Sequence, residues 1–529
     1  MTRLFEYQGK KLLDSAGITV PEGRVVSSAE EAESYARELG CAAVVKAQVW
    51  VTDRKSKGLL RFCKTPEAVR EAADEMLGQA IRGFAVGQVL VEELLDVDRE
   101  LCAAILVDDI NAQPVVMFSS MGGSGIEEIA REHPEAVARK SIDIKLGLRD
   151  FEARELVRRT TLDRALYNDA AAVLVKLYKA ARMGETRSIE INPLVVTKEG
   201  EWIAADCSAT VDDYAAFRHP ELGIEVAREL DHPPTALERI AYSVEEADHR
   251  GTFYFFQIIQ DIPADGRTTQ GEDIIGFHGS GAGGSMISMD PLSRLNFAPA
   301  NYCDTSANPP AGKFYRAARI ILAQPNLRGY FAGGSGVTSQ EQYYQARGLV
   351  KAFREVGLSV PAVIRLGGNR EELAIEILSK FLEDIGVPIE AYGKDDSPGS
   401  CAERLRALID GGPYQPKGPD PISNPNPPRE PYSFETFTGR VTFDHSRCGE
   451  CEKKPCVLAC HPNILEIKSG KPILNINEEE AKRGRCTECL ACEIACWSES
   501  FQAITIELPI HGLDEYLIET EKTLAREVS

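Results

Sequence analysis

The sequence predicts a multidomain α/β protein that ends in a small, separate α+β module. Two observations lead to this fold class. Most of the chain alternates short apolar runs with helix-like segments, and eight of its 14 cysteines fall between Cys448 and Cys496. A chain of 529 residues has room for three or four domains, since a domain usually contains about 100 to 200 residues. An apolar fraction of 43% is sufficient for ordinary buried cores.

The first predicted domain covers residues 1–235 and mixes helices with strands. The apolar run at residues 42–47 is typical of a short buried strand. Residues 153–183 indicate one long helix. Residues 189–196 predict a strand that is interrupted at Pro193, because proline has no amide to donate to a neighbouring strand.

The second predicted domain covers residues 250–411 and repeats one unit: a strand, a glycine turn and a helix. Residues 274–278 lead into the glycine loop 279–284, and residues 329–332 lead into Gly333–Gly336. A helix is expected to begin near Thr338, directly behind this second loop. The repetition favours a parallel sheet with helices on both faces.

The remaining segments are a linker, a module and a tail. Residues 412–433 are dense in proline and glycine, so we expect a semi-rigid tether without a core of its own. Residues 436–508 contain the clustered cysteines and form the predicted module. The acidic tail, residues 509–529, has the composition of one short helix.

The charge balance limits the possible partners. The chain has 81 acidic and 60 basic side chains, a formal charge of −21. Nucleic acids and anionic membranes bind mainly through Lys and Arg, so neither is an expected partner. No apolar run approaches the roughly 18 residues of a membrane-spanning helix, and the N-terminus lacks the apolar core of a signal peptide. We therefore expect a cytoplasmic protein.

The clustered cysteines form two runs of four, and thiolates suit iron. Structural zinc is the alternative, but zinc sites usually use two separated pairs of ligands, four in all. The other six cysteines stand singly and are expected to be small buried hydrophobes. The runs are Cys448-x2-Cys451-x4-Cys456-x3-Cys460 and Cys486-x2-Cys489-x2-Cys492-x3-Cys496.

These runs resemble those of two-cluster ferredoxins. In such proteins the first three cysteines of a run bind one cluster and the fourth binds the other. The resemblance implies two [4Fe–4S] clusters. Cluster 1 would be bound by Cys448, Cys451, Cys456 and Cys496, and cluster 2 by Cys460, Cys486, Cys489 and Cys492.

Residues 1–411 resemble the β subunit of succinyl-CoA synthetase, a member of the nucleoside-diphosphate-forming acyl-CoA synthetase superfamily. The resemblance implies an ATP-grasp domain followed by a flavodoxin-like ligase domain, and ATP or ADP with Mg²⁺ as cofactors. The segments that carry it are Phe5–Leu13, Val44–Val49, Leu90–Glu93, Arg99–Glu100, Ile189–Val195 and Ala204–Asp206.

The same resemblance assigns roles to individual residues. Lysine suits phosphates as a point charge, and carboxylate and carboxamide oxygens suit Mg²⁺. Without the family resemblance, the same residues would be interpreted as a lysine at the end of a strand, an exposed acidic loop and a turn at Asn192-Pro193. The nucleotide contacts would be Lys46, Arg54, Glu92 and Glu100, and the Mg²⁺ ligands Asn192 and Asp206.

The glycine loops of the second domain would face substrate and phosphate. In the family such a loop faces a phosphohistidine of the α subunit, and no equivalent histidine is found here, so no catalytic residue is assigned. An α-like partner that binds CoA is therefore expected in a hetero-oligomer, together with a redox partner. The loop residues are Ser280, Gly281, Gly333, Gly334, Ser335 and Gly336.

Several positions depart from the family pattern. The glycine-rich loop that covers the nucleotide phosphates reads Trp50–Gly58 here, and Thr52, Asp53 and Lys55 occupy it with a single glycine left. Asp304–Pro309 replaces another glycine run, and Ser280 stands where the family has an asparagine. A lysine usual just after the magnesium aspartate reads Ser208.

Two hypotheses of function follow. In the first, the chain is a β-like subunit of an ATP- and CoA-linked enzyme that is coupled to electron transfer. In the second, it is a non-catalytic electron-transfer subunit whose synthetase-like scaffold docks a redox partner and has lost ATP turnover.

Overall fold

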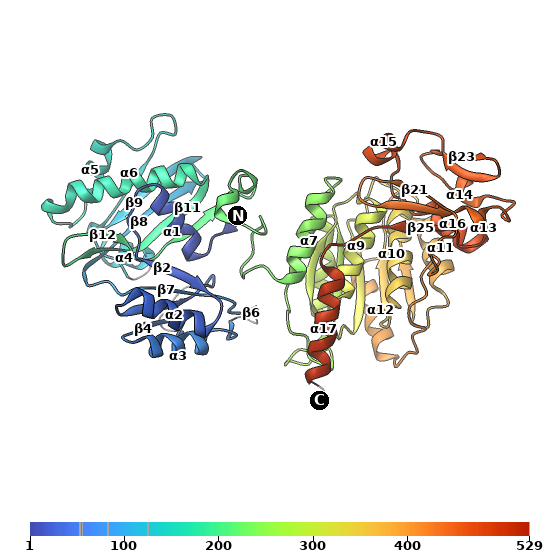
Figure 1. The fold of residues 1–529 in the computed structure, drawn as a ribbon, viewed down its shortest axis with the longest axis horizontal. Helices are drawn as coiled ribbons and strands as arrows, with labels where there is room; N and C mark the ends of the chain where they lie inside the picture. Colours follow the sequence, from blue (N-terminus) through green and yellow to red (C-terminus); the bar gives the residue numbers. More distant parts are fainter. Residues whose placement is uncertain (52–53, 55–56, 82–83, 124–125, 528–529) are drawn as a thin grey trace. The chain divides into compact units, whose positions relative to one another are not determined.

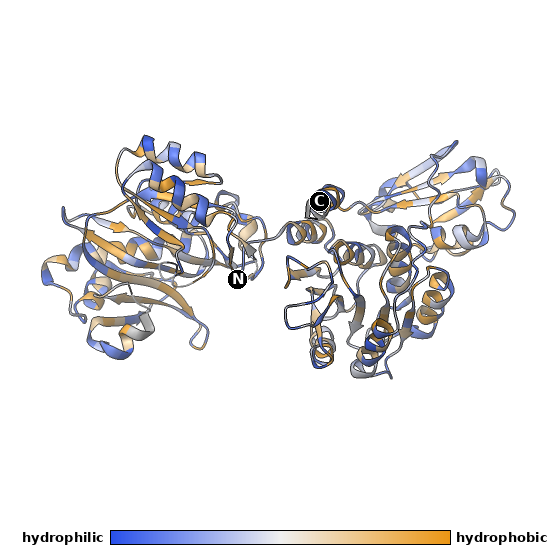
Figure 2. Cartoon of the chain, turned by 90° about the horizontal axis from the view of Figure 1, so that it is seen from below, coloured by the Kyte–Doolittle hydropathy of each residue, from blue (hydrophilic) through white to orange (hydrophobic). Residues whose placement is uncertain are grey.

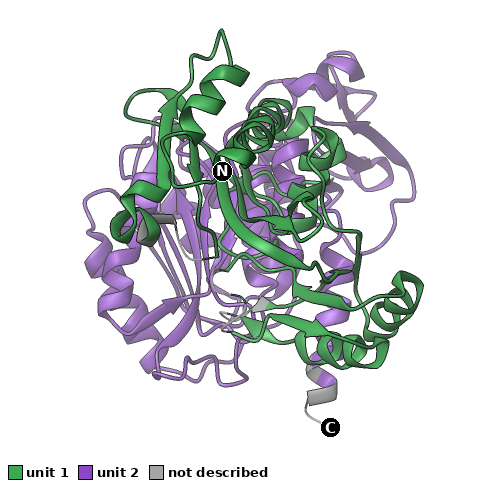
Figure 3. Cartoon of the chain, turned by 90° about the vertical axis from the view of Figure 1, so that its left-hand side faces the viewer, with its two compact units in different colours: residues 1–234 green, residues 235–529 purple. Residues whose placement is uncertain are grey.

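The computed structural model describes residues 1–51, 54, 57–81, 84–123 and 126–527. The chain forms two compact units, residues 1–234 and 235–529 (Figures 1 and 3). Each unit is described by itself below. Among the described residues, we find no helix with both the length and the apolar character that a membrane crossing requires.

The first unit contains two main antiparallel sheets. One has seven strands in the order β1-β13-β11-β8-β9-β10, with β12 beside β11, and the other has four in the order β2-β7-β3-β4. The strands are β1 (Thr2–Arg3), β2 (Gly23–Val26), β3 (Ala43–Ala47), β4 (Leu60–Cys63), β5 (Ala80–Ile81), β6 (Phe84–Ala85), β7 (Val89–Glu93), β8 (Val97–Asp108), β9 (Gln113–Ser119), β10 (Val137–Ser141), β11 (Thr186–Thr197), β12 (Trp202–Ala204) and β13 (Ser208–Val211).

Helices cover one face of each sheet in this unit. Helix α6 packs on β8 and β11 of the larger sheet, and α2 and α3 pack together against the smaller one (Figure 1). Local sequence sets their ends: Ser28 caps α2 by accepting from the Glu31 amide, and Gly40 ends it at φ 70°. The helices are α1 (Glu6–Ser15), α2 (Ala29–Leu39), α3 (Pro66–Met76), α4 (Ile126–Glu132), α5 (Asp150–Val157) and α6 (Tyr167–Met183).

Two expectations for the first unit need correction. The single helix predicted for 153–183 is two helices, α5 and α6, because Asp163 caps a separate turn between them by accepting from the Ala165 amide. The strand predicted to break at Pro193 is the continuous β11. Its pairing with β8 shifts register between Ile191 and Leu194, and this irregularity accommodates the missing proline amide.

The second unit is built on a seven-stranded sheet in the order β14-β17-β15-β18-β19-β20, with β16 beside β15. We call it the central sheet. All its pairings are parallel except that of edge strand β14 with β17, which is antiparallel. Its strands are β14 (Tyr254–Gln257), β15 (Asp273–Ser280), β16 (Phe297–Pro299), β17 (Asn301–Asp304), β18 (Gly329–Gly334), β19 (Ala362–Arg365) and β20 (Ile389–Tyr392).

Helices cover both faces of the central sheet, as the repeated pattern predicted. Helices α8 and α12 pack on one face, and α9, α10 and α11 follow one another on the other (Figure 1). Apolar residues dominate the strands between them (Figure 2). The helices are α7 (Ala236–Ala247), α8 (Ala282–Arg294), α9 (Ala311–Leu322), α10 (Tyr343–Val356), α11 (Glu371–Leu382) and α12 (Pro398–Asp410).

The helix expected to begin near Thr338 begins at Tyr343 instead. Thr338 forms a parallel bridge with Gly368, and the Gln342 amide donates to the Asn369 carbonyl at 2.9 Å. The chain therefore follows the neighbouring loop before it turns into α10.

The proline-rich segment is packed rather than free, which corrects the predicted tether. Ile422 is fully buried. The Lys417 amide donates to the Ile385 carbonyl at 2.9 Å, and the Asp420 amide donates to the Arg354 carbonyl at 2.8 Å. Arg354 also pairs with the Asp420 carboxylate at 2.7 Å. The segment thus lies fixed along the helices of the central sheet.

The cysteine-rich module shares a hydrophobic core with one face of the central sheet. It has a three-stranded sheet, β21-β22-β25, and a hairpin, β23-β24. The acidic tail forms α17, which contacts α7. The elements are β21 (Pro431–Glu435), β22 (Arg440–Asp444), α13 (His445–Cys448), α14 (Pro455–Leu458), β23 (Leu465–Lys468), β24 (Lys471–Leu474), α15 (Glu478–Glu480), α16 (Ala491–Glu499), β25 (Ile504–Glu507) and α17 (Leu513–Glu527).

Candidate functional site

Two predicted nucleotide contacts lie on neighbouring strands of the smaller sheet. Lys46 is on β3 and Glu92 is on β7, where Glu92 faces Val44 across the pair. Residues 44 and 46 share one face because side chains alternate along a strand, so Glu92 and Lys46 meet. The Lys46 Nζ lies 2.8 Å from Glu92 Oε2, and both side chains are buried.

Helix α1 contributes two further charges that the sequence reasoning did not place in the site. Lys10 Nζ lies 2.6 Å from Glu92 Oε1 and 2.9 Å from Glu6 Oε1, and Glu6 Oε1 is also 2.8 Å from Lys46 Nζ. Glu6 and Lys10 stand four residues apart, on one face of the helix. The sequence contained one indication of their role, because both charges lie on the helix face that also carries the buried Leu13.

Arg54 joins this group to the predicted Mg²⁺ ligand. Its guanidinium lies 2.6 Å from Glu6 Oε2 and 2.6 Å from Asp206 Oδ2. Three cations and three carboxylates thus form one connected network, which we call the ion-pair network. Its members are Glu6, Lys10, Lys46, Arg54, Glu92 and Asp206.

The network shifts the pKa values of Glu6 and Lys46 in favour of their charged forms. Burial alone would raise the pKa of Glu6, but Lys10, Lys46 and Arg54 hold that pKa well below its usual value. Burial opposes the charge of Lys46, yet Glu6, Glu92 and Asp206 raise its pKa. Glu92 is therefore already paired on both oxygens, and in this structure it is not presented to a ligand.

Glu100, a predicted nucleotide contact, and Asn192, a predicted Mg²⁺ ligand, both lie beside a glycine loop after β9. Asn192 Oδ1 accepts from the Gly123 amide at 3.0 Å. Glu100 is exposed, and a Cβ on Gly123 would stand 2.6 Å from its Oε2. Gly122 and Gly123 were not singled out in the sequence, although a glycine pair behind a strand is a loop signal.

Asn192 and Asp206 lie on adjoining segments. The Ala205 amide donates to the Pro193 carbonyl at 3.1 Å, and the carbonyl of Ala205 accepts from Lys46 at 2.6 Å. The structure therefore gathers the predicted nucleotide and Mg²⁺ residues in the first unit. The replacements noted at Thr52, Asp53 and Lys55 lie outside the described residues.

The predicted substrate loops lie at the carboxyl ends of β15 and β18. Gly279 and Ser280 pair with Gly333 and Gly334, so the loops that follow them stand side by side. In parallel α/β sheets this edge is the usual ligand-binding edge. A Cβ on Gly284 would come within 2.3 Å of the Ser335 amide nitrogen.

Side chains from neighbouring loops hold both glycine loops. Asp304 Oδ1 accepts from the Gly281 amide at 2.8 Å, and burial raises the pKa of this carboxyl. Arg365 Nη1 donates to the Gly334 carbonyl at 2.8 Å. Gly336 adopts a φ of 74°, and Ser280 Oγ donates to the Ser306 carbonyl at 3.1 Å.

The eight clustered thiols form two neighbouring sets. Burial, together with the nearby thiols Cys496, Cys448 and Cys451, raises the pKa of Cys456 to about 12. Burial also raises the pKa of Cys492, and its neighbouring thiols act in the same direction. Those neighbours include the three other members of the second predicted set, Cys489, Cys486 and Cys460.

Backbone amides lie close to several of the thiol sulfurs. The Ala503 amide donates to Cys496 Sγ at 3.2 Å, and backbone amides also point at Cys456, Cys460 and Cys486. Within the described residues, no three His, Cys, Asp or Glu side chains close around a single metal ion. Ligands of a cubane do not converge on one point, because the cluster core stands between them.

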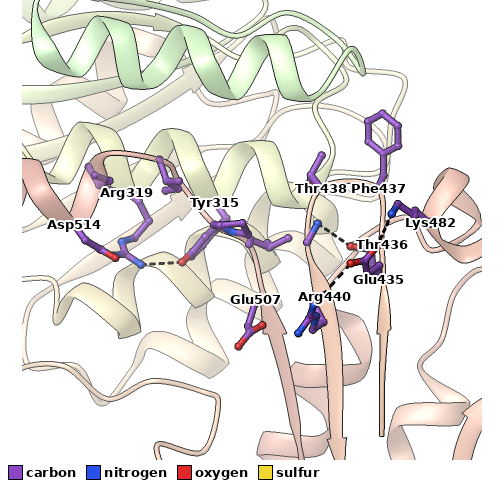
Figure 4. A pocket seen from close by; sticks show the side chains of 15 residues that line it. Tyr315, Arg319, Glu435, Thr436, Phe437, Thr438, Arg440, Lys482, Glu507 and Asp514 are labelled. Carbon is purple, nitrogen blue, oxygen red and sulfur yellow. Dashed lines mark hydrogen bonds and ion pairs between the residues drawn. The ribbon is translucent and has the colours of Figure 1, made fainter. Parts of the chain in front are cut away.

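A separate pocket of the second unit lies away from all these residues. Its volume is about 640 Å³, and it lies among α9, the module strands and the start of α17. Two of its basic side chains have partners: Lys482 contacts Glu435 at 2.5 Å, and Arg319 donates to Tyr315 Oη at 2.8 Å (Figure 4). None of the predicted site residues lines it.

Comparisons with known proteins agree with this layout. The model of the ATP-grasp domain family matches residues 3–196. The β subunit of the GDP-forming succinate–CoA ligase of Thermus thermophilus is 37% identical over 390 residues, which cover 74% of this chain and 95% of that protein. The β subunit of the ADP-forming ligase of Rubrobacter xylanophilus is 32% identical over 410 residues, covering 77% of this chain and 99% of that protein.

A solved structure is similar in fold. ATP citrate lyase from Methanothrix soehngenii, in complex with citrate and coenzyme A, superimposes with a TM-score of 0.59 at 20% identity. The match covers 76% of this chain and 99% of that one. At this identity the likeness establishes an ATP-grasp type of α/β multidomain fold and nothing about ligands.

Proposed function

The chain belongs to the family of succinate–CoA ligase β subunits, and from that premise we propose that it is the β-like subunit of an ATP- and CoA-linked acyl-CoA synthetase-type complex coupled to electron transfer through two [4Fe–4S] clusters. The relatives are named as ADP- and GDP-forming ligase subunits, which supports the nucleotide part. CoA would reach the complex through an α-like partner subunit.

One observation carries the electron-transfer part. The two sets of four thiols lie in the same compact unit as the central sheet, and the thiols within each set are neighbours of one another. The donor sets and the amides directed at the sulfurs fit two [4Fe–4S] clusters. When bound, such clusters supply one-electron storage and transfer.

The chain's own residues would then divide the binding work. Lys46 and Arg54 would contact nucleotide phosphates, and Asn192 and Asp206 would hold Mg²⁺. Because Arg54 pairs with Asp206 at 2.6 Å, metal binding requires that this ion pair opens. Glu92 could reach adenine only after leaving its lysines, whereas exposed Glu100 is free to meet the ribose.

Metal analysis of protein prepared without oxygen tests the cluster assignment. We expect about eight irons and eight acid-labile sulfides per chain, from four in each cluster. Cys456→Ser should disturb the electron spin resonance signal of one cluster more than that of the other. Four irons, or stoichiometric zinc, would refute the assignment.

Partner binding is expected at the substrate loops. Three apolar side chains are exposed there: Val337 at 83%, Ile287 at 65% and Met286 at 64%. Met286 and Ile287 follow Gly284, which contacts Ser335, so the three gather at one edge of the central sheet. Purification from the native host at moderate salt should yield a complex with an α-like subunit, and a lone monomer would contradict this.

The ion-pair network favours a second candidate, a non-catalytic electron-transfer subunit that keeps the synthetase-like scaffold to dock its partner. The network is electrically balanced, and Arg54 covers the predicted metal ligand. Calorimetry with Mg²⁺ and ATP separates the two candidates. The ligase subunit predicts heat that Asp206→Ala abolishes and that Asn192→Ala, outside the network, abolishes as well; the scaffold predicts equal heats, or none, for all three proteins.

A further inference from the structure

Helix α10 contacts both the substrate loops and the cysteine-rich module. At its start, Gln345 Nε2 lies 3.4 Å from Ser280 Oγ. In the same turn, Tyr344 Oη lies 3.4 Å from Nδ1 of His461, the residue after Cys460. Further along, Lys351 Nζ lies 2.9 Å from Oε1 of Glu493, the residue after Cys492. One helix therefore touches the neighbours of two ligands of predicted cluster 2.

Arg347 lies on this helix between Tyr344 and Lys351. It lines a pocket of about 220 Å³ with Ala459 and Ala491, which precede Cys460 and Cys492. Its guanidinium stands over the Tyr343 ring, 4.7 Å from the centroid. Its Nη1 is buried without a hydrogen-bond partner among the described residues. Arg347 as a whole is partly buried, so its charge is only partly screened by water.

The acidic side chains beside the same thiols are already neutralised. Glu488 pairs with Arg250 at 2.5 Å, and Glu493 pairs with Lys351. The other charged residues that line the pocket, Glu376, Lys380 and Glu499, are exposed, so water screens them. Arg347 is therefore the charged residue lining this pocket whose charge water screens least.

Cluster 1 has a cation of a different origin. Lys454, which belongs to the module itself, is buried and donates to the carbonyls of Cys448 and Cys451. Each four-thiol set therefore has at its side a buried or partly buried cation for which the structure shows no carboxylate partner among the described residues. For the first set that cation comes from the module, and for the second it comes from α10.

We propose that the Arg347 guanidinium sets the reduction potential of the cluster bound by Cys460, Cys486, Cys489 and Cys492, and thereby couples that cluster to the helix that contacts the substrate loops. The inference rests on the proposed function, since it requires the two clusters. A nearby positive charge stabilises the more negative reduced state, so Arg347 raises the potential. The potential of cluster 1 depends on Lys454 instead.

Redox titration of the anaerobic full-length protein, followed by electron spin resonance, tests this. Arg347→Gln should change the reduction equilibrium of one of the two clusters about tenfold, which lowers the midpoint potential of its signal by 59 mV for one electron. Lys454→Gln should lower the midpoint potential of the other cluster. Arg347→Lys keeps the charge and should stay near the wild-type value. Lys380→Gln, at an exposed position of the same pocket, should move neither signal.

The outcomes separate this inference from the function it rests on. Wild-type protein without iron or signals would refute the clusters and the inference together. Two wild-type signals that Arg347→Gln leaves unmoved, or shifts equally, would overturn the inference alone. Loss of iron from Arg347→Gln that Lys380→Gln retains would show a structural role and would also overturn it.

Discussion

The buried pair Lys351–Glu493 should fix the module to the central sheet. Lys351 Nζ lies 2.9 Å and 3.1 Å from the two Glu493 oxygens, and the side chains are 2% and 0% exposed. Lys351→Met would leave a buried carboxylate without its cation, and breaking such a pair costs about 3–5 kcal/mol. Since about 1.4 kcal/mol corresponds to a factor of ten, local opening should rise at least a hundredfold.

Hydrogen exchange read by mass spectrometry measures this opening in peptides from α10 and α16. The double variant Lys351→Met, Glu493→Gln should recover most of the loss, because residue 493 is then neutral and Glu355, the other partner of Lys351, keeps its pair with Arg319 at 2.8 Å. Arg404→Met removes a pair that is half exposed on the arginine side, and it should leave these peptides unchanged. If Lys351→Met exchanged like wild type, the module would not be fixed by this pair.

Two further predictions concern the ion-pair network and a glycine loop. The pKa of Glu6 lies well below its usual 4.5, so its stabilisation is complete above pH 4.5 and is lost as the pH falls through the lowered pKa. In urea unfolding, the stability gap between wild type and Glu6→Gln should therefore be wide at pH 7 and close in acid; a constant gap would contradict the network. Gly336→Ala should cost about 1–2 kcal/mol in thermal unfolding, because φ is 74° and the new Cβ would lie 2.9 Å from an Arg365 nitrogen. Gly399→Ala, inside α12, would place its new Cβ 3.7 Å from Ser397 Oγ, an ordinary contact, and should stabilise by up to about 1 kcal/mol; equal effects of the two changes would refute the argument.

The parts of the fold that local pattern specifies were predictable from the sequence. Strands β15, β18 and β19 each precede a glycine turn, and this repetition correctly predicted a parallel sheet with helices on both faces. Edge strand β14 runs antiparallel, and nothing in its sequence marks its direction. The cysteine runs are also local, since each spans a few turns of chain, whereas the assignment of each fourth cysteine to the other run's cluster stays a prediction.

The rest depends on contacts between distant residues. The ion-pair network brings Glu6 to Lys46 and Arg54 to Asp206, and no short-range pattern encodes such pairings. The proline-rich segment has the composition of a tether, yet one apolar residue, Ile422, anchors it. The start of α10 was misplaced because Thr338 pairs with Gly368 of another loop.

The ion-pair network changes what the retained polar residues mean for function. Polar side chains gathered at one cleft argue for a nucleotide only if nothing else satisfies them. Here Lys46 and Glu92 satisfy each other, and Arg54 satisfies Asp206, so a scaffold that no longer binds ATP would have a structural reason to keep them. Exposed Glu100, and Asn192 beside the Gly123 loop, lie outside these six charges. Variants of these two residues therefore report on nucleotide binding more directly than variants within the network, whose loss would destabilise the fold in either case.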